Sequence, residues 1–467
     1  MLKGELVEQK VFVFSDASHA LKNIRNAWSS YRFILSPRVV EKEKLVSPIV
    51  DLDHVRQLFN FQKDKELKYN PGLDVDCFPS PTDNLLKMKV GPAKRLCSKA
   101  TADGLRMLVK NHGYPPSFNT TAYFLEMLGT WVDMMLSRSR SQSFSLKNED
   151  KFKEMIEFFE EFNRLFDELR FECKSGNVHK PIQKCVWLSS TSMVAAAKYF
   201  LYERKWDFLL GGRFTSDAIE NFFSQVRRKN PNPTPMEFQW RFRALLLLQH
   251  MKSSKYQSYQ EDDTDCKWLT ELKDIKELQL LKEEEEDKDD NDLCDHVVQE
   301  RVYADFAEQN SLTYGIGYIL LKTIFSKSKC VTCQKAFAME TSDGSEWLKL
   351  IEEKCYVPNA LTIPSEMAYS LFSVCETTFR DTRSNALLIK DFDSMLVDKM
   401  YDTLVGDQFP FDVPTCHLKL LLERFFTIRL HWWSKFLTRK AQGTDEFIAK
   451  KKAAGYASKS VQGSQLT

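Results

Sequence analysis

Residues 211–228 read Gly-Gly-Arg-Phe-Thr-Ser-Asp-Ala-Ile-Glu-Asn-Phe-Phe-Ser-Gln-Val-Arg-Arg. The glycine pair and the two hydroxyl residues predict the end of one element, and Thr215 or Ser216 can cap a helix that begins near Asp217. Four apolar residues at spacings i, i+3, i+4 and i+7 then give this helix one apolar face: Ile219, Phe222, Phe223 and Val226. The stretch therefore predicts a short amphipathic helix.

Glu220 lies beside that apolar face, on the same row as Ser224 and Arg227. An acid at the edge of a buried stripe can reach a cleft and act there. An acid in this position is also typical of a solvated or ion-paired surface. Spacing alone leaves both interpretations open.

The composition limits the class of protein. A chain of 467 residues can hold two to four domains. The 66 basic and 65 acidic residues give a net charge of +1, so any DNA contact must come from local basic patches. Eleven cysteines, an odd number, and no apolar secretory segment favour reduced thiols in the nucleus or cytosol. The apolar runs fall short of the roughly 20 residues that cross a bilayer, so we expect no membrane association.

The chain begins with a predicted buried strand, Lys10 to Ser15, that has nothing before it to pair with. Residues 16–19 end this strand and begin a helix whose outer side is basic, with Lys22 and Arg25 facing out. His19 is either a functional residue or an ordinary histidine at a helix start.

A helical pattern covers residues 38–185, and the clearest segments are Val50 to Phe61, Leu85 to Leu108, Thr121 to Leu136 and Lys151 to Phe171. The chain has no sequence motif for a phosphate-binding loop. A basic cluster at Lys87, Lys89, Lys94 and Arg95 is typical of a solvated helix face. Further helices are predicted at Trp187 to Tyr202 and Met236 to Gln249.

The acidic residues 253–295 predict a linker or an exposed helix, because like charges at this density repel one another. Residues 300–440 are helical again, and the tail after Lys440 is predicted to be disordered. Cys330 and Cys333 have the spacing of a zinc knuckle, and the nearest further ligands are Cys416, His417 and His431. Two reduced core cysteines explain the pair equally well.

Three stretches together resemble the P element-type transposases, a group that includes vertebrate proteins with an amino-terminal zinc-coordinating THAP domain. Residues 16–26 (Asp-Ala-Ser-His-Ala-Leu-Lys-Asn-Ile-Arg-Asn) are similar to the family's Asp-Pro-Pro-His-Leu-Ile-Lys-x-x-Arg-Asn, although Ala17 and Ser18 replace both prolines. Residues 216–227 with 232–238 are similar to Gln-Asp-Ala-Leu-Glu-Asn-Phe-Phe-Ser-x-x-Arg and Asn-Pro-Thr-Pro-x-x-Phe. Residues 315–333 and 416–429 resemble the family's carboxy-terminal region more loosely.

The resemblance implies a mostly α protein with a small β remnant. It would be an incomplete ribonuclease H-like α/β fold, interrupted by a large helical insertion and followed by a helical C-terminal domain. The implied domains are the end of the ribonuclease H-like half (1–37), the GTP-binding insertion (38–185), the returning ribonuclease H-like segment (186–250), an acidic linker (251–299), the helical C-terminal domain (300–440) and the tail (441–467).

In the family, two aspartates and one glutamate hold a pair of Mg²⁺ ions that act on DNA, and Glu220 occupies the position of the glutamate. By this resemblance both aspartates precede the segment that corresponds to residues 10–26, so Asp16 is expected to shape the loop that presents His19 to DNA. We therefore expect a transposase-derived, catalytically incomplete protein that retains DNA and GTP binding. The alternatives are the carboxy-terminal part of an active transposase and a helical interaction scaffold.

The resemblance also implies the partners and the location. DNA would contact His19, Lys22, Arg25, Arg227 and Arg228. GTP and Mg²⁺ are the implied cofactors, with structural Zn²⁺ at Cys330, Cys333, Cys416 and His417 if the knuckle is a metal site. The protein is expected in the nucleus or cytoplasm, and the implied partners include further copies of the same chain.

Overall fold

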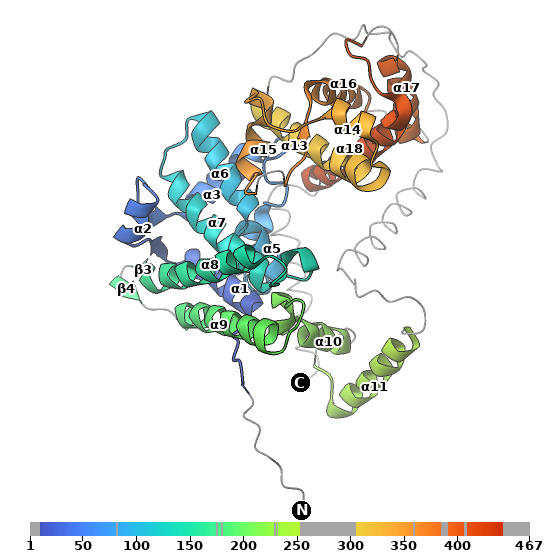
Figure 1. The fold of residues 1–467 in the computed structure, drawn as a ribbon. Coiled ribbons are helices and arrows are strands. Elements are labelled where there is room, and N and C mark those ends of the chain that lie inside the picture. Colours follow the sequence, from blue (N-terminus) through green and yellow to red (C-terminus); the bar gives the residue numbers. More distant parts are fainter. Residues whose placement is uncertain are drawn as a thin grey trace, which may run out of the picture. The chain divides into compact units, whose positions relative to one another are not determined.

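The computed structural model describes residues 10–80, 83–173, 176–178, 181–227, 230, 232–252, 305–357, 360–383, 391–405 and 409–441. Over these residues the protein is mostly helical, as the sequence predicts (Figure 1). The chain divides into two compact units: Met1–Thr215 with Val298–Thr467, and Ser216–Val297. The predicted acidic linker and the predicted disordered tail after Ala441 lie outside the described residues.

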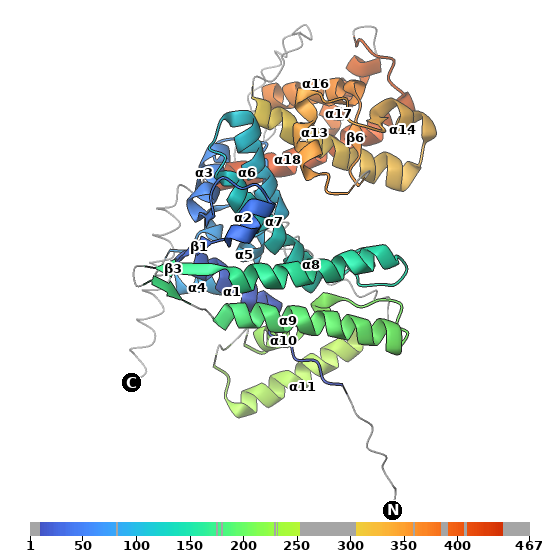
Figure 2. The same ribbon diagram turned by 60° about the vertical axis from the view of Figure 1, so that its left-hand side comes forward.

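The first core of the larger unit is built by α1 to α9. Its helices are α1 (Ala17–Trp28), α2 (Pro37–Lys42), α3 (Leu52–Gln62), α4 (Asn84–Met88), α5 (Val90–Leu96), α6 (Lys99–His112), α7 (Phe118–Met135), α8 (Glu149–Glu168) and α9 (Pro181–Lys198), with short turns η1 (Val75–Cys77), η2 (Arg140–Gln142), η3 (Tyr199–Glu203) and η4 (Gly211–Phe214). Helices α8 and α9 lie side by side (Figure 2). The buried Trp131 on α7 donates its indole N–H to Ser190 Oγ on α9 at 2.9 Å, which ties two of these helices together.

The predicted buried strand at Lys10 to Ser15 is wrong, because these residues form an extended segment with no strand partner among the described residues. Val11 is 81% exposed. Hydroxyl groups of α9 take the place of a neighbouring strand: Ser15 N donates to Ser189 Oγ at 3.0 Å, and Ser192 Oγ donates to Val13 O at 2.5 Å. A strand is stable only when its backbone groups find partners, and here side chains of a helix supply them.

The small sheet lies elsewhere than predicted. Strands β1 (Arg32–Ile34), β2 (Ile49–Val50), β3 (Arg170–Cys173) and β4 (Gly176–Val178) form an antiparallel sheet in the order β2-β1-β3-β4. Phe33 stands opposite Val50 on one side and Phe171 on the other, and it is fully buried. The predicted helix to Phe171 therefore ends early, at Glu168, because Phe171 pairs with Phe33 in the sheet.

The predicted helix Leu85 to Leu108 is broken into α4, α5 and α6. Lys89 has an extended backbone, and Pro92 lies in the first turn of α5, where a missing N–H costs little. Ser98 then caps α6, since its side chain accepts from Thr101 N. Pro92 and Ser98 explain both breaks locally.

The second core of the larger unit is helical, as predicted for residues 300–440. Its elements are α13 (Phe306–Leu320), the π-helical η5 (Leu321–Ser328), α14 (Val331–Phe337), β5 (Ala338–Met339), η6 (Glu346–Leu348), α15 (Lys349–Lys354), β6 (Ile363–Pro364), α16 (Glu366–Thr382), α17 (Phe392–Val405), η8 (Thr415–His417) and α18 (Leu418–Ala441). Strands β5 and β6 pair antiparallel. Ile316, Phe372 and Phe426 contribute fully buried side chains from α13, α16 and α18.

The smaller unit contains α10 (Asp217–Arg227) and α11 (Pro235–Lys252). Helix α10 begins at the predicted residue. Of its predicted apolar face, Val226 is buried, whereas Ile219 is 61% exposed and Phe223 is 37% exposed. The face is therefore only partly covered within the described residues of this unit.

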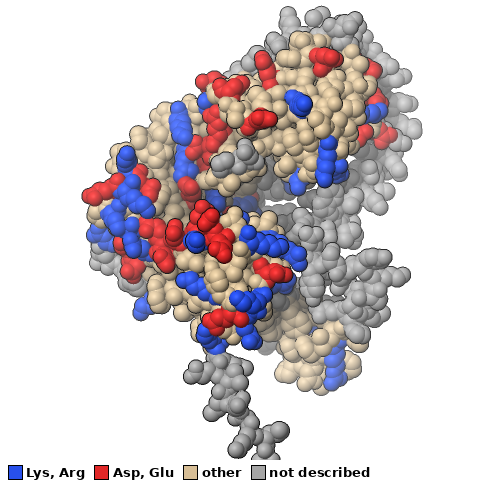
Figure 3. Space-filling model, in the orientation of Figure 1, with Lys and Arg blue, Asp and Glu red and all other residues tan. Residues whose placement is uncertain are grey.

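Acidic and basic side chains are interspersed over the visible face of the larger unit (Figure 3). This mixture agrees with the net charge of +1. Among the helices that the structure describes, none combines the length and the apolar character that crossing a bilayer requires.

Candidate functional site

Glu220 lies exposed in the first turn of α10. Its backbone N–H donates to Ser216 O at 2.9 Å, and its Oε1 accepts from Ser216 Oγ at 3.1 Å. Ser216 is one of the two residues predicted to cap this helix. The helix start thus holds the Glu220 carboxylate close to its own backbone.

Two reciprocal hydrogen bonds between Thr234 and Glu237 cap the start of α11, which follows α10. Thr234 N donates to Glu237 Oε2 at 2.8 Å, while Glu237 N donates to Thr234 Oγ1 at 3.3 Å. This arrangement is a capping box, which satisfies donors at the start of α11. Arg241 Nη1 donates to Val226 O at 2.7 Å and so caps the end of α10 from α11.

Aromatic contacts hold α10 against α11. Phe222 meets Phe242 edge-on at 5.4 Å between ring centroids, and Phe223 lies 6.3 Å from Phe238. A hollow of about 640 Å³ opens between the two helices, and Arg227 and Pro233 belong to its lining. The Arg227 guanidinium lies 5.5 Å from the centroid of the Phe223 ring, and Arg227 is exposed.

The acids of the smaller unit's described residues do not by themselves fit a pair of Mg²⁺ ions. Between residues 216 and 252 the chain has three acids, Asp217, Glu220 and Glu237. Glu237 is used by the capping box, and its backbone bond to Thr234 holds its pKa below the usual range. Each Mg²⁺ needs several oxygen ligands, so Glu220 and Asp217 alone cannot hold two.

The start of α1 presents His19. Asp16 caps the helix, with its Oδ1 accepting from Ser18 N at 2.7 Å, and its Oδ2 lies 3.3 Å from Nδ1 of His19. The His19 side chain is about half exposed, and Lys22, one turn later, is half-buried. His19 and Lys22 can therefore meet an external partner.

Arg25 does not face outward as predicted. Its side chain is 1% exposed, and its Nη2 donates to Leu86 O and Lys87 O, both at 2.8 Å. These are carbonyls near the end of α4, where a cation is favourable. Burial lowers the pKa of Arg25. The predicted DNA contact at Arg25 is thus wrong, and Arg228 lies outside the described residues.

Two guanidinium groups of the predicted insertion are committed to ion pairs. Arg38 pairs with Glu161 and Glu168 at 2.9 and 3.0 Å, and Arg95 pairs with Asp74 at 2.8 Å. In the basic cluster of α4 and α5, Lys89 and Lys94 are exposed. Exposed lysines fit the charge of a triphosphate, although they do not define a pocket.

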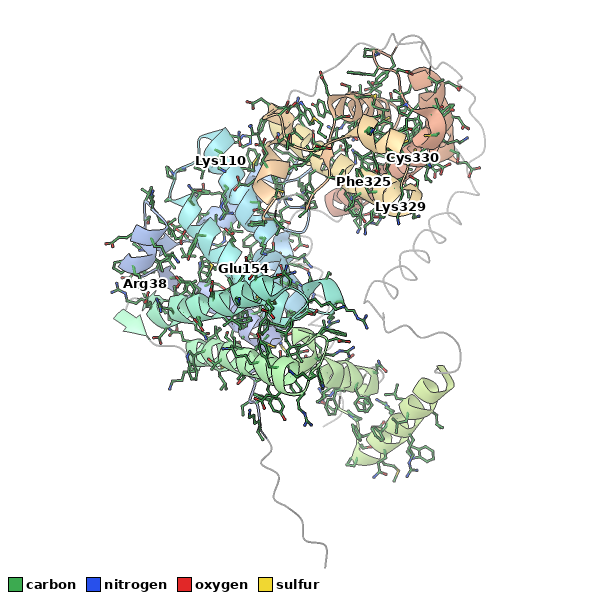
Figure 4. The ribbon with its side chains drawn as sticks, in the orientation of Figure 1. Arg38, Lys110, Glu154, Phe325, Lys329 and Cys330 are labelled. Carbon is green, nitrogen blue, oxygen red and sulfur yellow. The ribbon has the colours of Figure 1, made fainter. Side chains whose placement is uncertain are left out.

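Four predicted metal ligands meet in the second core. Cys330 caps α14 and Cys333 is buried in its first turn, while Cys416 and His417 lie in η8 at the start of α18. Sγ of Cys416 lies 3.8 Å from that of Cys330 and 3.2 Å from that of Cys333. Figure 4 shows Cys330 beside Lys329, at the end of the segment that carries Phe325. His431, the fifth predicted ligand, is not part of this group.

The Cys330 and Cys333 thiols have opposite surroundings. The backbone N–H of Cys333 lowers the pKa of Cys330. Burial and the neighbouring sulfur atoms raise the pKa of the Cys333 thiol. Cys416 is exposed and His417 is half-buried, so the group reaches the surface.

Residues 18–150 match the family model of the TNP-like, GTP-binding insertion domain. The chain is 25% identical over 265 residues to the Transposable element P transposase of Drosophila melanogaster, covering 56% of this chain and 33% of that protein. The chain is related to the P element-type transposases. The Drosophila P element transposase strand transfer complex gives a TM-score of 0.42 at 22% identity, over 51% of this chain and 52% of that one. This P element-type relative spans about a third of the length of the curated transposase.

The family-model match covers part of the helical first core. It includes His19 and Lys22 and overlaps the insertion predicted over 38–185, whose boundaries remain a prediction. Glu220 and the Cys/His group lie outside it.

One polar cluster of this relative was not anticipated. Asp103 on α6 is buried, and the Tyr356 hydroxyl donates to its Oδ1. Arg106 lies 3.7 Å from the same oxygen. Tyr356 and Asp103 lie far apart in the sequence, so no spacing pattern could have revealed the pair.

Proposed function

We propose that this protein binds GTP through residues 18–150 and DNA through basic positions on α1 and α10, and that residues 1–467 alone do not cut DNA. The observation that carries the proposal is the match of residues 18–150 to the GTP-binding insertion domain of transposase-like proteins. Saturable binding of GTP by the purified chain would support the nucleotide assignment, and failure to bind would contradict it.

The support for DNA binding comes from three accessible side chains, His19, Lys22 and Arg227. Arg and Lys are the usual partners of DNA phosphates, and such contacts weaken as salt rises. Arg25 is excluded from this set because it is buried. A protein of this kind would act in the nucleus.

The proposal that residues 1–467 do not cut DNA is supported by the small number of carboxylates available as Mg²⁺ ligands near Glu220. Mg²⁺ in a two-metal site stabilises both the attacking and the leaving oxygen, and it needs several carboxylates to do so. In the resemblance to the family, Glu220 stands at the position of the catalytic glutamate, and among the described residues of the smaller unit Asp217 and Glu220 are the acids that the capping box does not use. We derive no catalytic step for residues 1–467.

A second candidate function is DNA strand cleavage by a longer protein that contains these residues. Glu220 favours it, because the helix holds the family's glutamate in an exposed first turn. Two assays on the same preparation test DNA binding and DNA cleavage separately.

The assay measures binding of a fluorescent duplex by the purified chain at about 50 and 200 mM salt. We expect affinity to fall with salt, and Lys22→Ala and Arg227→Ala each to reduce the slope of log K against log salt by about 1. Lys147→Ala, at an exposed position before α8, is the matched control and should leave the slope unchanged. Salt-independent or absent binding would favour the helical scaffold instead.

The same preparation is incubated with supercoiled plasmid and Mg²⁺. We expect no nicking from wild type or from Glu220→Ala, which should fold normally because Glu220 is exposed. Metal-dependent nicking that disappears in Glu220→Ala would contradict the proposed inactivity and establish cleavage by this chain.

A further inference from the structure

Three thiols and one imidazole converge where α14 and α18 begin. The ligand atoms of Cys330, Cys333, Cys416 and His417 all lie within 4.8 Å of one another. The two halves of the group come from helix starts that are 83 or more residues apart along the chain. Within each half the ligands are close in the sequence, Cys330 with Cys333 and Cys416 with His417. The fold brings the two halves together.

The edges of the group match a tetrahedron of metal ligands. With a Zn–S distance of about 2.3 Å and a Zn–N distance of about 2.0 Å, tetrahedral ligands lie about 3.8 Å apart between sulfurs and about 3.5 Å apart between sulfur and nitrogen. The observed sulfur separations are 3.8 and 3.2 Å. Cys333 Sγ lies 3.5 Å from His417 Nδ1.

The simpler explanations fit less well. A disulfide requires sulfurs about 2.0 Å apart. Cys416 lies 3.8 and 3.2 Å from the other two sulfurs, and all three cysteines are free. Reduced cysteines that serve only as core residues are buried, yet Cys416 is exposed and Cys330 and His417 are half-buried. Four donors that gather at a surface instead fit a bound cation.

The donor set selects the metal. Thiolate and imidazole ligands suit Zn²⁺, whereas Mg²⁺ and Ca²⁺ prefer oxygen. Three cysteines and one histidine complete a closed four-coordinate site, which leaves no position for a reacting water. The site is therefore structural in type.

We infer that Cys330, Cys333, Cys416 and His417 bind one Zn²⁺ ion that clamps the start of α14 to the start of α18. The clamp fixes the origin of a helix whose following turns bury Leu421, Leu422 and Phe425 in the second core. Loss of the metal loosens this core, and the four ligands lie outside residues 18–150 and do not include Glu220. The inference is independent of GTP and DNA binding.

The test is metal analysis of the full chain, purified without chelator and without a metal-affinity tag. We expect one zinc per chain in wild type, and less than a tenth of that in Cys416→Ser and in His417→Ala. Cys355→Ser is the matched control, because Cys355 is a half-buried cysteine of the same region outside the group, and it should retain full zinc.

Two further readouts keep the test decisive if a variant folds poorly. Wild type treated with a zinc chelator should show a thermal midpoint lowered by several degrees, and zinc should restore it. Co²⁺ added to the metal-free chain should give the visible absorption of a tetrahedral cobalt thiolate. Substoichiometric zinc in wild type, equal zinc in Cys416→Ser and Cys355→Ser, or no cobalt spectrum would each overturn the inference.

Discussion

The buried carboxyl of Asp103 is expected to make the stability of the protein depend on pH. Its side chain is 3% exposed, and Tyr356 donates to it while Arg106 stands 3.7 Å away. Burial raises the pKa of Asp103 to about 6, and the Tyr356 bond offsets only part of that rise. In the unfolded chain the same carboxyl has a pKa of about 4.

Stability is therefore expected to fall as pH rises from about 4 to about 6, because the folded state keeps a proton that the unfolded state releases. The shift of about two units corresponds to about 3 kcal/mol. Urea unfolding of wild type and Asp103→Asn at pH 4 and pH 7 measures it. From pH 4 to pH 7, the free energy of unfolding of Asp103→Asn should rise relative to that of wild type by up to this amount. Parallel pH profiles would contradict the assignment, and Asp398→Asn, at an exposed position, is the control.

The candidate site residues differ in how far the sequence could predict them. Cys330, Cys333, Cys416 and His417 were found because metal ligands come in short recognisable spacings. Arg25 was misjudged because helical periodicity cannot show that a neighbouring chain end, at Leu86 and Lys87, offers carbonyls to its guanidinium. Asp103 and Tyr356 could not be paired at all without the fold.

At the scale of elements, Gly211 and Gly212 begin η4 and pack it closely against α7. Gly211 N donates to Ser137 Oγ at 2.9 Å, and Gly212 N donates to Ser137 O at 3.0 Å. A Cβ on Gly211 would lie 2.3 Å from Met134 O, in the last turn of α7. The backbone of η4 therefore lies so close to the end of α7 that no residue with a Cβ fits at position 211.

Gly211→Ala is expected to lower the free energy of unfolding by about 1–3 kcal/mol, because the backbone of η4 or α7 must move to admit the methyl group. Chemical denaturation measures the change. Gly91→Ala is the control: its Cβ would meet only Arg95 Nη1, at 3.7 Å, and the variant should be neutral or more stable by up to about 1 kcal/mol. Equal effects of the two substitutions would refute the close approach.

Helices were predicted more reliably than strands. The start of α10 follows from Ser216, which bonds to residues next to it in the chain. The helix predicted from Met236 begins at Pro235, and the Thr234 cap was not predicted. Residues 10–15 have the composition of a strand, but pairing depends on partners far away in the chain, and α9 supplied hydroxyls instead. For the same reason the sheet around Phe33 was not foreseen.

At the scale of the whole molecule, ion pairs connect the two cores of the larger unit. Glu66, which follows α3, pairs with Arg383 and with Arg429 of α18, and Lys65 pairs with Asp305. Arg429 is 1% exposed and also meets the buried Glu376 at 2.5 Å. Buried charges of this kind are costly when one partner is lost, so the two cores are expected to unfold together.

The family assignment explains why a region with no phosphate-loop motif is nonetheless expected to hold a nucleotide. Exposed Lys89 and Lys94 are compatible with a triphosphate, and the match over residues 18–150 is what points to GTP. GTP binding by residues 18–150 is therefore the central property proposed for this protein.

Hydrogen–deuterium exchange of the purified chain, with and without saturating GTP, tests this most directly. We predict slower exchange within residues 18–150 on addition of GTP, with a smaller effect or none from ATP at the same concentration. Unchanged exchange throughout residues 18–150 in the presence of GTP would contradict the account.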